Sequence, residues 1–162
     1  MEEEAPDVVH EVVVTWLSVY LGAWLLPRGG VIGGAARFLV GAERGRKTDV
    51  FVFLPGSPKP RRRGPSRRAP DIVIEVVSPT PRDVRRDRIE KMAEYAAFGV
   101  KWYWIVDPDA RIVEIHERGA DGRYVHLIGA TEVQLDVPGC AGLTLDLADL
   151  WKQVDELPVD ET

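Results

Sequence analysis

Residues 71–77, with the sequence Asp-Ile-Val-Ile-Glu-Val-Val, decide the fold of this chain because they place a carboxylate inside an otherwise apolar strand. Pro70 and Pro79 bracket the run, and β-branched residues dominate it without polar alternation, which is typical of an interior strand covered on both faces. With a strand period of two, Asp71 and Glu75 point to the same face of the sheet. A buried carboxylate without a partner is costly or takes up a proton. Glu75 therefore needs a cation, either an Arg or Lys side chain or a bound metal ion.

The length and composition limit the class of protein. A chain of 162 residues, 45% of them apolar, suffices for one sizeable core, so we expect a single domain over residues 1–162 with its core from about 7 to 151. The apolar run at residues 12–26 is too short to cross a membrane and follows acidic residues, which favours a soluble, cytoplasmic protein. Cys140 is the only cysteine, which excludes an internal disulfide and a cysteine-cluster zinc site.

Charge is distributed unevenly along the chain. The net charge of −5 argues against a nucleic-acid partner, because affinity for phosphate backbones comes from Lys and Arg. Residues 42–91, however, contain 14 Lys and Arg against 7 Asp and Glu, while the rest of the chain has 7 against 19. This asymmetry permits a local anion-binding surface on an acidic protein. A solvated, charged loop is the plainer interpretation.

Hydrophobic periodicity and turn residues predict a mixed α/β fold. The expected elements are a helix at 7–26, a hairpin of strands 35–40 and 48–54, a mobile basic loop at 55–69, strand 71–77, helix 83–98, strands 102–106, 111–117 and 124–128, a short strand near 132–135, and a helix at 146–151. The order strand, helix, strand over 71–106 indicates a βαβ unit whose two strands are parallel. The later strands form an antiparallel C-terminal extension.

Two carboxylates and a lysine are the candidates for chemistry. If strand 48–54 pairs with strand 71–77, Asp49 and Glu75 converge at one edge of the sheet and offer the oxygen ligands that Mg²⁺ prefers. The next helix supplies Lys91, which could stabilise a phosphate group. The plainer interpretation of Lys91 is an i, i+4 ion pair with Asp87.

Several segments together resemble the Uma2 family of restriction-endonuclease-like bacterial proteins, over about residues 35–151. The segments are Arg-Lys-Thr-Asp-Val at 46–50, Ala-Pro-Asp-Ile-Val-Ile-Glu-Val-Val-Ser-Pro at 69–79, Asp87, Lys91, Tyr95, Gly-Val at 99–100, and Tyr-Trp-Ile-Val-Asp-Pro at 103–108. The resemblance implies the PD-(D/E)XK nuclease fold, with a restriction endonuclease-like mixed sheet. It also implies a catalytic Mg²⁺ or Mn²⁺ ion and a nucleic-acid substrate, with DNA preferred.

The resemblance assigns roles residue by residue. Asp49 matches the first metal-binding acid and Glu75 the second, so both are expected to be metal ligands and catalytic. The usual lysine two residues after the second acid is replaced by Val77. Lys91 matches the position to which family members displace that lysine, and it is the third expected catalytic residue. Thr48 departs from the family pattern, in which a proline precedes the first acid.

Other expectations concern binding. A group of loop arginines is expected to contact the nucleic-acid backbone: Arg61, Arg62, Arg63, Arg67 and Arg68. Asp71 matches a family position but is expected to be structural, capping the strand entrance or pairing with Arg67 or Arg68. Exposed apolar strands and Trp151, together with the analogy to enzymes that cut both strands of a duplex, favour a homodimer.

Plainer interpretations remain for several residues. His10 is expected at the surface or satisfied in the core, and His116 and His126 receive no role. The aromatic run 102–104 is expected to pack in the core rather than stack on bases. Two rival functions stay open at this point: a catalytically silent binding protein, in which Glu75 pairs with Lys91 or an arginine, and a metal-dependent phosphoesterase that acts on small substrates.

Overall fold

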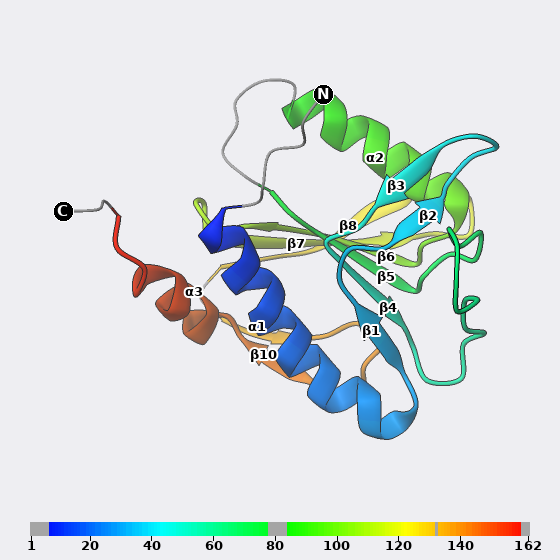
Figure 1. Ribbon diagram of the computed structural model, residues 1–162. Helices are drawn as coiled ribbons and strands as arrows, with labels where there is room; N and C mark the ends of the chain where they lie inside the picture. The colour runs from blue at the N-terminus through cyan, green and yellow to red at the C-terminus, as the bar shows by residue number, and fades with distance from the viewer. Residues whose placement is uncertain (1–6, 78–83, 132, 160–162) are drawn as a thin grey trace.

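The computed structural model describes residues 7–77, 84–131 and 133–159, without the side chains of residues 84–87 and 130. A central sheet has the strand order β1-β4-β5-β6-β7-β8 (Figure 1). Its strands are β1 (Val31–Gly33), β4 (Val50–Phe53), β5 (Ile72–Val76), β6 (Trp102–Asp107), β7 (Ile112–Arg118) and β8 (Tyr124–Ala130). Two small sheets pair β2 (Arg37–Leu39) with β3 (Gly45–Lys47) and β9 (Gln134–Asp136) with β10 (Thr144–Asp146). The helices are α1 (Val8–Leu25), a 3₁₀ turn η1 (Leu26–Arg28), α2 (Val84–Phe98) and α3 (Leu147–Asp155).

The predicted βαβ unit is confirmed. β5 pairs in parallel with β6, α2 connects them, and every other pairing in the central sheet is antiparallel. β5 is an interior strand and all five of its residues are buried. Gly99, at φ 105°, follows α2 in a backbone conformation that residues with a Cβ rarely adopt. The mixed sheet with an N-terminal helix and an antiparallel extension therefore agrees with the expected fold class.

Helices cover both faces of the sheet (Figure 1). α1 and α3 lie over one face, where Val13, Leu17, Leu21 and Leu25 recur at a spacing of four residues and are fully buried against the sheet. α2 covers the other face above a smaller core cluster. Trp104 belongs to the larger cluster and Tyr103 to the smaller one, so the expected core packing of these aromatic residues is confirmed.

The predicted hairpin of strands 35–40 and 48–54 is wrong. β2 pairs instead with β3, which lies within the predicted turn, and β4 pairs with β1 on one side and β5 on the other. The physical reason is close packing at the β1–β4 contact, where a Cβ on Gly33 would lie 2.5 Å from the Phe51 ring. β1 is short and lies between glycines, so its sequence shows little hydrophobic periodicity, although its pairing with β4 is well defined.

The basic loop is irregular, as predicted, but it is attached to the fold rather than free. Ser66 donates its backbone N–H to Arg37 O and accepts a hydrogen bond from Leu39 N at 2.8 Å, which ties the loop to β2. Trp151 is buried, and its indole N–H donates to Thr131 O, so it offers no surface for a dimer. The expected break at residues 78–81, the side chain of Asp87 and residue 132 lie outside the described residues.

The helical stretch from Val8 to Arg28 is long and apolar enough to cross a membrane by length and composition alone. One-third of this stretch is buried inside the structure. Core helices pass the same test of length and composition, and the leucines of α1 belong to the larger core cluster.

Candidate metal centre

The register of β4 and β5 places Asp49 beside Glu75. Val50 lies opposite Ile74 in this antiparallel pair, so the residue before β4 reaches the end of β5. Asp49 Oδ2 accepts a hydrogen bond from the backbone N–H of Val76 at 2.7 Å. The Asp49 side chain is thereby fixed at the edge of the sheet where β5 ends.

Glu75 lies between the sheet and α2. Its side chain is 8% exposed, and the Tyr95 hydroxyl donates to its Oε1 at 3.0 Å. Lys91 Nζ, one turn earlier on α2, is 4.0 Å from Glu75 Oε2. The structure thus brings together the three residues that the sequence singled out, Asp49, Glu75 and Lys91.

Burial dominates the electrostatics of Glu75. It raises the pKa of Glu75, the Lys91 ammonium lowers it, and the charge of Asp49 raises it again; the outcome is a pKa of about 8. Smaller contributions are a hydrogen bond from Tyr95, which lowers the pKa, and a side-chain hydrogen bond with Asp49, which raises it. Neighbouring carboxyl groups, one of them with a strongly raised pKa, are typical of functional sites.

His10 lies beside Asp49, half-buried and with a polar partner, as the satisfied residue that the sequence led us to expect. Its Nε2 is 3.1 Å from Asp49 Oδ1, and its side chain is 16% exposed. The spacing that places it there is visible in α1, because His10 precedes the buried Val13 and Leu17 by three and seven residues. The spacing in the sequence puts His10 on the buried face of α1. It does not show that this face lies over the end of β5, which only the structure reveals.

The donor set fits a hard divalent cation. Within residues 7–77, 84–131 and 133–159, no group of three or more His, Cys, Asp and Glu side chains could hold a metal ion. The two carboxylates of Asp49 and Glu75 nevertheless match the way Mg²⁺ is usually bound, through one or two carboxylates with waters and phosphate oxygens as the other ligands. A cation there would also offset the cost of ionising Glu75, whose pKa is raised in the chain alone.

Asp71 and the loop arginines lie at the other end of the strand. Asp71 Oδ2 accepts a hydrogen bond from Leu54 N at 2.7 Å, which closes the base of the basic loop. Four residues separate Asp71 from Glu75, which corresponds to about 13 Å along an extended strand. Asp71 is therefore a structural cap of the strand entrance. The five loop arginines, Arg61, Arg62, Arg63, Arg67 and Arg68, are exposed.

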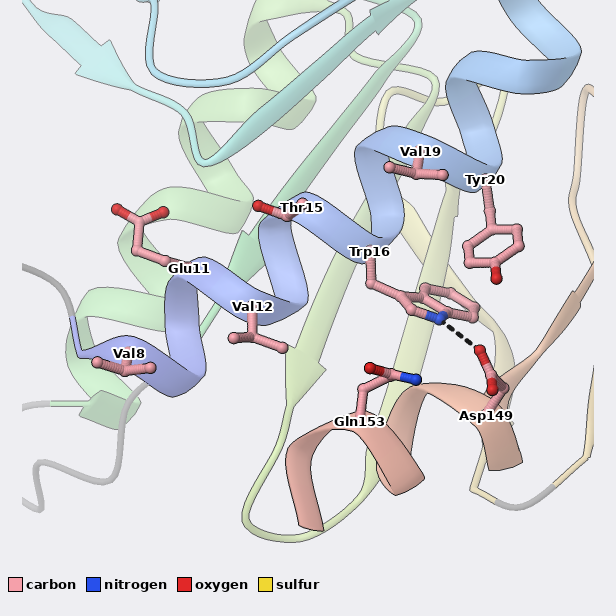
Figure 2. A pocket seen from close by; sticks show the side chains of 9 residues that line it. All are labelled: Val8, Glu11, Val12, Thr15, Trp16, Val19, Tyr20, Asp149 and Gln153. Atoms are coloured by element: carbon pink, nitrogen blue, oxygen red, sulfur yellow. Dashed lines mark hydrogen bonds between the residues drawn. The ribbon is translucent and has the colours of Figure 1, made fainter. Parts of the chain in front are cut away.

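A groove of about 560 Å³ lies on the α1–α3 side of the molecule (Figure 2). Val12, Trp16 and Tyr20 line it from α1, and Asp149 and Gln153 from α3. Asp149 accepts a hydrogen bond from the Trp16 indole at 2.9 Å. Neither candidate carboxylate lines this groove, so it is separate from the candidate metal centre.

The family follows from a comparison of the chain with models of known families. The model for Uma2, described as "Putative restriction endonuclease", matches residues 2–148. The chain belongs to the Uma2 family. The match covers nine-tenths of its length, including all three candidate residues.

A solved structure shares the fold of this Uma2 protein. It is the crystal structure of a putative nuclease belonging to DUF820 from Anabaena variabilis ATCC 29413, with a TM-score of 0.73 and 18% sequence identity. The similarity covers 95% of this chain and 86% of the other. At this identity the likeness shows the fold alone. No curated protein matches the chain.

Proposed function

We propose that this Uma2 protein is a Mg²⁺- or Mn²⁺-dependent endonuclease that hydrolyses phosphodiester bonds in DNA, with residues 1–162 acting as one domain. The observation that carries the proposal is the register of β4 and β5, which places Asp49 beside the buried Glu75 at one end of the sheet and fixes it through Val76 N–H. Two adjacent carboxylates repel each other once both are ionised, and a cation held between them would offset that repulsion. The family description as a nuclease supports the same assignment.

In the proposed mechanism, Asp49 and Glu75 would hold the metal ion. A bound Mg²⁺ or Mn²⁺ ion supplies positive charge that stabilises the negative charge developing on the phosphate during hydrolysis. Glu75 must first lose its proton, and Lys91 favours that loss because its ammonium group lowers the pKa of Glu75. Lys91 is partly exposed, so its positive charge can also face a phosphate oxygen of the substrate.

The proposed DNA contacts are the exposed side chains of Arg61, Arg62, Arg63, Arg67 and Arg68, on the loop that joins β4 to β5. Lys and Arg side chains supply the affinity of proteins for phosphate backbones. The role of these arginines is to hold the substrate, and the chemistry belongs to the carboxylates and Lys91.

A homodimer in the cytoplasm completes the proposal. Trp151 cannot contribute to the interface, but Val125 and Leu127 are exposed on β8, an edge strand of the central sheet. Light scattering of the full chain tests the oligomeric state: a mass of two chains supports the dimer, and a mass of one chain contradicts it. The single cysteine, Cys140, is buried and free, which is compatible with a reducing compartment.

One observation favours a second candidate, the catalytically silent binding protein. Glu75 already has protein partners, because Tyr95 donates to one of its oxygens and Lys91 lies 4.0 Å from the other. In that case the buried acid is neutralised within the chain and no ion is required. A phosphoesterase that acts on small substrates has no such specific support, and the exposed loop arginines suit a polymer better.

Plasmid and single-stranded DNA, incubated with the protein and Mg²⁺, Mn²⁺ or chelator, separate these functions. Cutting is expected with either ion and not with chelator. It should be lost in Asp49→Ala and Glu75→Ala, but kept in Glu43→Ala, which changes an exposed acid outside the site. Cutting that survives both site substitutions contradicts the assignment. Absence of cutting together with absence of metal binding favours the silent protein, and turnover of small phosphodiesters without DNA cutting favours the phosphoesterase.

A further inference from the structure

We propose that His10 is a positioning residue of the metal centre, which holds the Asp49 carboxylate against Glu75. The expected effect on metal binding depends on the proposed function. The positioning of Asp49 itself is argued only from the contacts that Asp49 makes. It also gives α1 a part in the site in addition to its part in the core.

Each oxygen of Asp49 faces a different polar group. The backbone N–H of Val76 donates to Oδ2 at 2.7 Å, and His10 Nε2 lies 3.1 Å from Oδ1. An ionised carboxylate can only accept hydrogen bonds, so the proton of the contact lies on Nε2 of the histidine. One donor leaves a carboxylate free to turn about that bond, whereas two donors from different elements fix its plane. His10 is the donor that comes from outside the sheet.

The ring of His10 is itself held in place. Val13 and Leu17 follow it on the same face of α1 and are fully buried, so the helix cannot shift without breaking the core. Within the described part of the chain, His10 Nδ1 is buried and has no hydrogen-bond partner, and Glu11 Oε2 is 4.0 Å away. The short polar contact of the ring is therefore the 3.1 Å approach of Nε2 to Asp49 Oδ1, while Glu11 Oε2 lies at the longer distance of 4.0 Å.

Holding Asp49 matters because its neighbour repels it. Asp49 and Glu75 are both acids and lie at adjacent ends of the paired strands β4 and β5. Two carboxylates side by side repel each other, and a side chain that can rotate moves away. Donors that fix Asp49 keep the two acids converged, which is the arrangement that one ion needs. Groups that orient metal ligands in this way typically change metal affinity by about 10–100-fold when they are removed.

The test compares three variants of the full chain. His10→Leu removes the donor with little change in volume, and His10→Gln keeps an N–H donor that reaches a similar distance from the backbone. His126→Ala is the control, because it removes an exposed histidine on β8. Two quantities are measured: the proton shift of the Val76 amide by NMR without metal, and the dissociation constant for Mn²⁺ by calorimetry.

We expect His10→Leu to move the Val76 amide resonance and to weaken Mn²⁺ binding by about 10–100-fold. His10→Gln should restore most of both, and His126→Ala should change neither. An unmoved Val76 resonance in His10→Leu overturns the inference. If, in addition, His10→Leu and His10→Gln lose Mn²⁺ affinity equally, the result indicates instead that His10 binds the ion directly.

Two measurements keep this inference separate from the proposed function. If the unmodified chain binds no Mn²⁺, the proposed function fails, and the Val76 resonance alone decides the role of His10. Long-range nitrogen–proton NMR of the unmodified chain shows which ring nitrogen of His10 carries the proton. The Nε2–H tautomer is required, and an Nδ1–H tautomer overturns the inference even if no variant folds.

Discussion

Tyr95 donates its hydroxyl hydrogen to Glu75 Oε1 across 3.0 Å, and its ring is fully buried between α2 and the sheet. Burial and the neighbouring Glu75 both raise the pKa of Tyr95 above its usual value, so the hydroxyl remains a donor at any physiological pH. The centroid of the Tyr103 ring, on β6, lies 5.2 Å from that of the Tyr95 ring, and the two rings pack together. Each candidate carboxylate therefore contacts one ring, Tyr95 for Glu75 and His10 for Asp49.

Replacing Tyr95 by Phe should raise the pKa of Glu75 above about 8, because the hydrogen bond from Tyr95 lowers it. Loss of one buried hydrogen bond should also cost about 1 kcal/mol of unfolding free energy. Carboxyl-carbon NMR titration with chelator present measures the pKa, and urea unfolding measures the stability. Tyr20→Phe, on the exposed side of α1, is the control. An unchanged or lowered pKa of Glu75 would show that the hydroxyl does not stabilise its charged form.

The raised pKa of Glu75 makes stability depend on pH. The folded chain keeps the proton up to about pH 8, whereas the unfolded chain releases it near the ordinary glutamate value of 4.5. The stabilisation is therefore fully present below pH 4.5 and is lost as the pH rises to 8, by up to about 1.4 kcal/mol per pH unit. Urea unfolding of the chain and of Glu75→Gln, both with chelator, isolates this contribution as their difference. A difference in unfolding free energy between the two proteins that stays constant from pH 5 to 8 would contradict this prediction.

Lys91→Met should reduce DNA cutting while leaving Mn²⁺ bound, because a lysine supplies charge to the phosphate but no ligand to a cation. Removal of the ammonium also raises the pKa of Glu75, so the variant should need a higher pH to bind the ion. Cutting rates at saturating metal and Mn²⁺ calorimetry over pH 7 to 9 separate these two effects. Full cutting activity in Lys91→Met would remove this residue from the catalytic group.

The loop arginines should control DNA affinity and its salt dependence. Arg67→Ala combined with Arg68→Ala is expected to reduce the slope of log affinity against log salt by about 0.9 for each DNA phosphate that is no longer neutralised. Arg123→Ala combined with Lys152→Ala, two exposed cations outside the loop, should leave the slope unchanged. The dissociation constant for a labelled DNA duplex, measured at several salt concentrations, gives this slope. Equal slopes for both double variants would place the DNA elsewhere on the molecule.

Gly33→Ala tests the pairing of β1 with β4, the strand that follows Asp49. A Cβ at this position would lie 2.5 Å from the Phe51 ring, so we expect a loss of about 1–3 kcal/mol in unfolding free energy. Gly34→Ala is the matched control, because the nearest atom to its added Cβ is 3.5 Å away. Similar stabilities of the two variants would argue against the close packing of β1 on β4.

Long elements and the pair of acids could be predicted from the sequence, because they rest on local patterns. Helix α1 and the β5–α2–β6 unit have enough periodic residues to define their type. Once β4 is assumed to pair with β5, the position of Asp49 beside Glu75 follows from strand geometry. The pairing of β1 with β4 could not be predicted, because three residues ending in glycine carry no distinct period.

The contacts of the two acids with His10 and Tyr95 could not be predicted, for a different reason. His10 and Tyr95 lie on helices, and which strand residue a helix face contacts depends on how the helix crosses the sheet. The sequence shows that His10 shares a face with Val13, but it does not show that this face ends above Asp49. Three-dimensional packing decides that contact.

Calorimetric titration of Mn²⁺ into the unmodified chain, Asp49→Asn and Glu75→Gln tests the central claim most directly. Both substitutions preserve shape and remove one ionisable carboxylate each from the proposed pair. We predict one ion bound per chain in the unmodified protein and loss of that binding in each variant. Binding of equal strength in all three proteins, or no binding in the unmodified chain, would contradict the assignment of Asp49 and Glu75 as a metal centre.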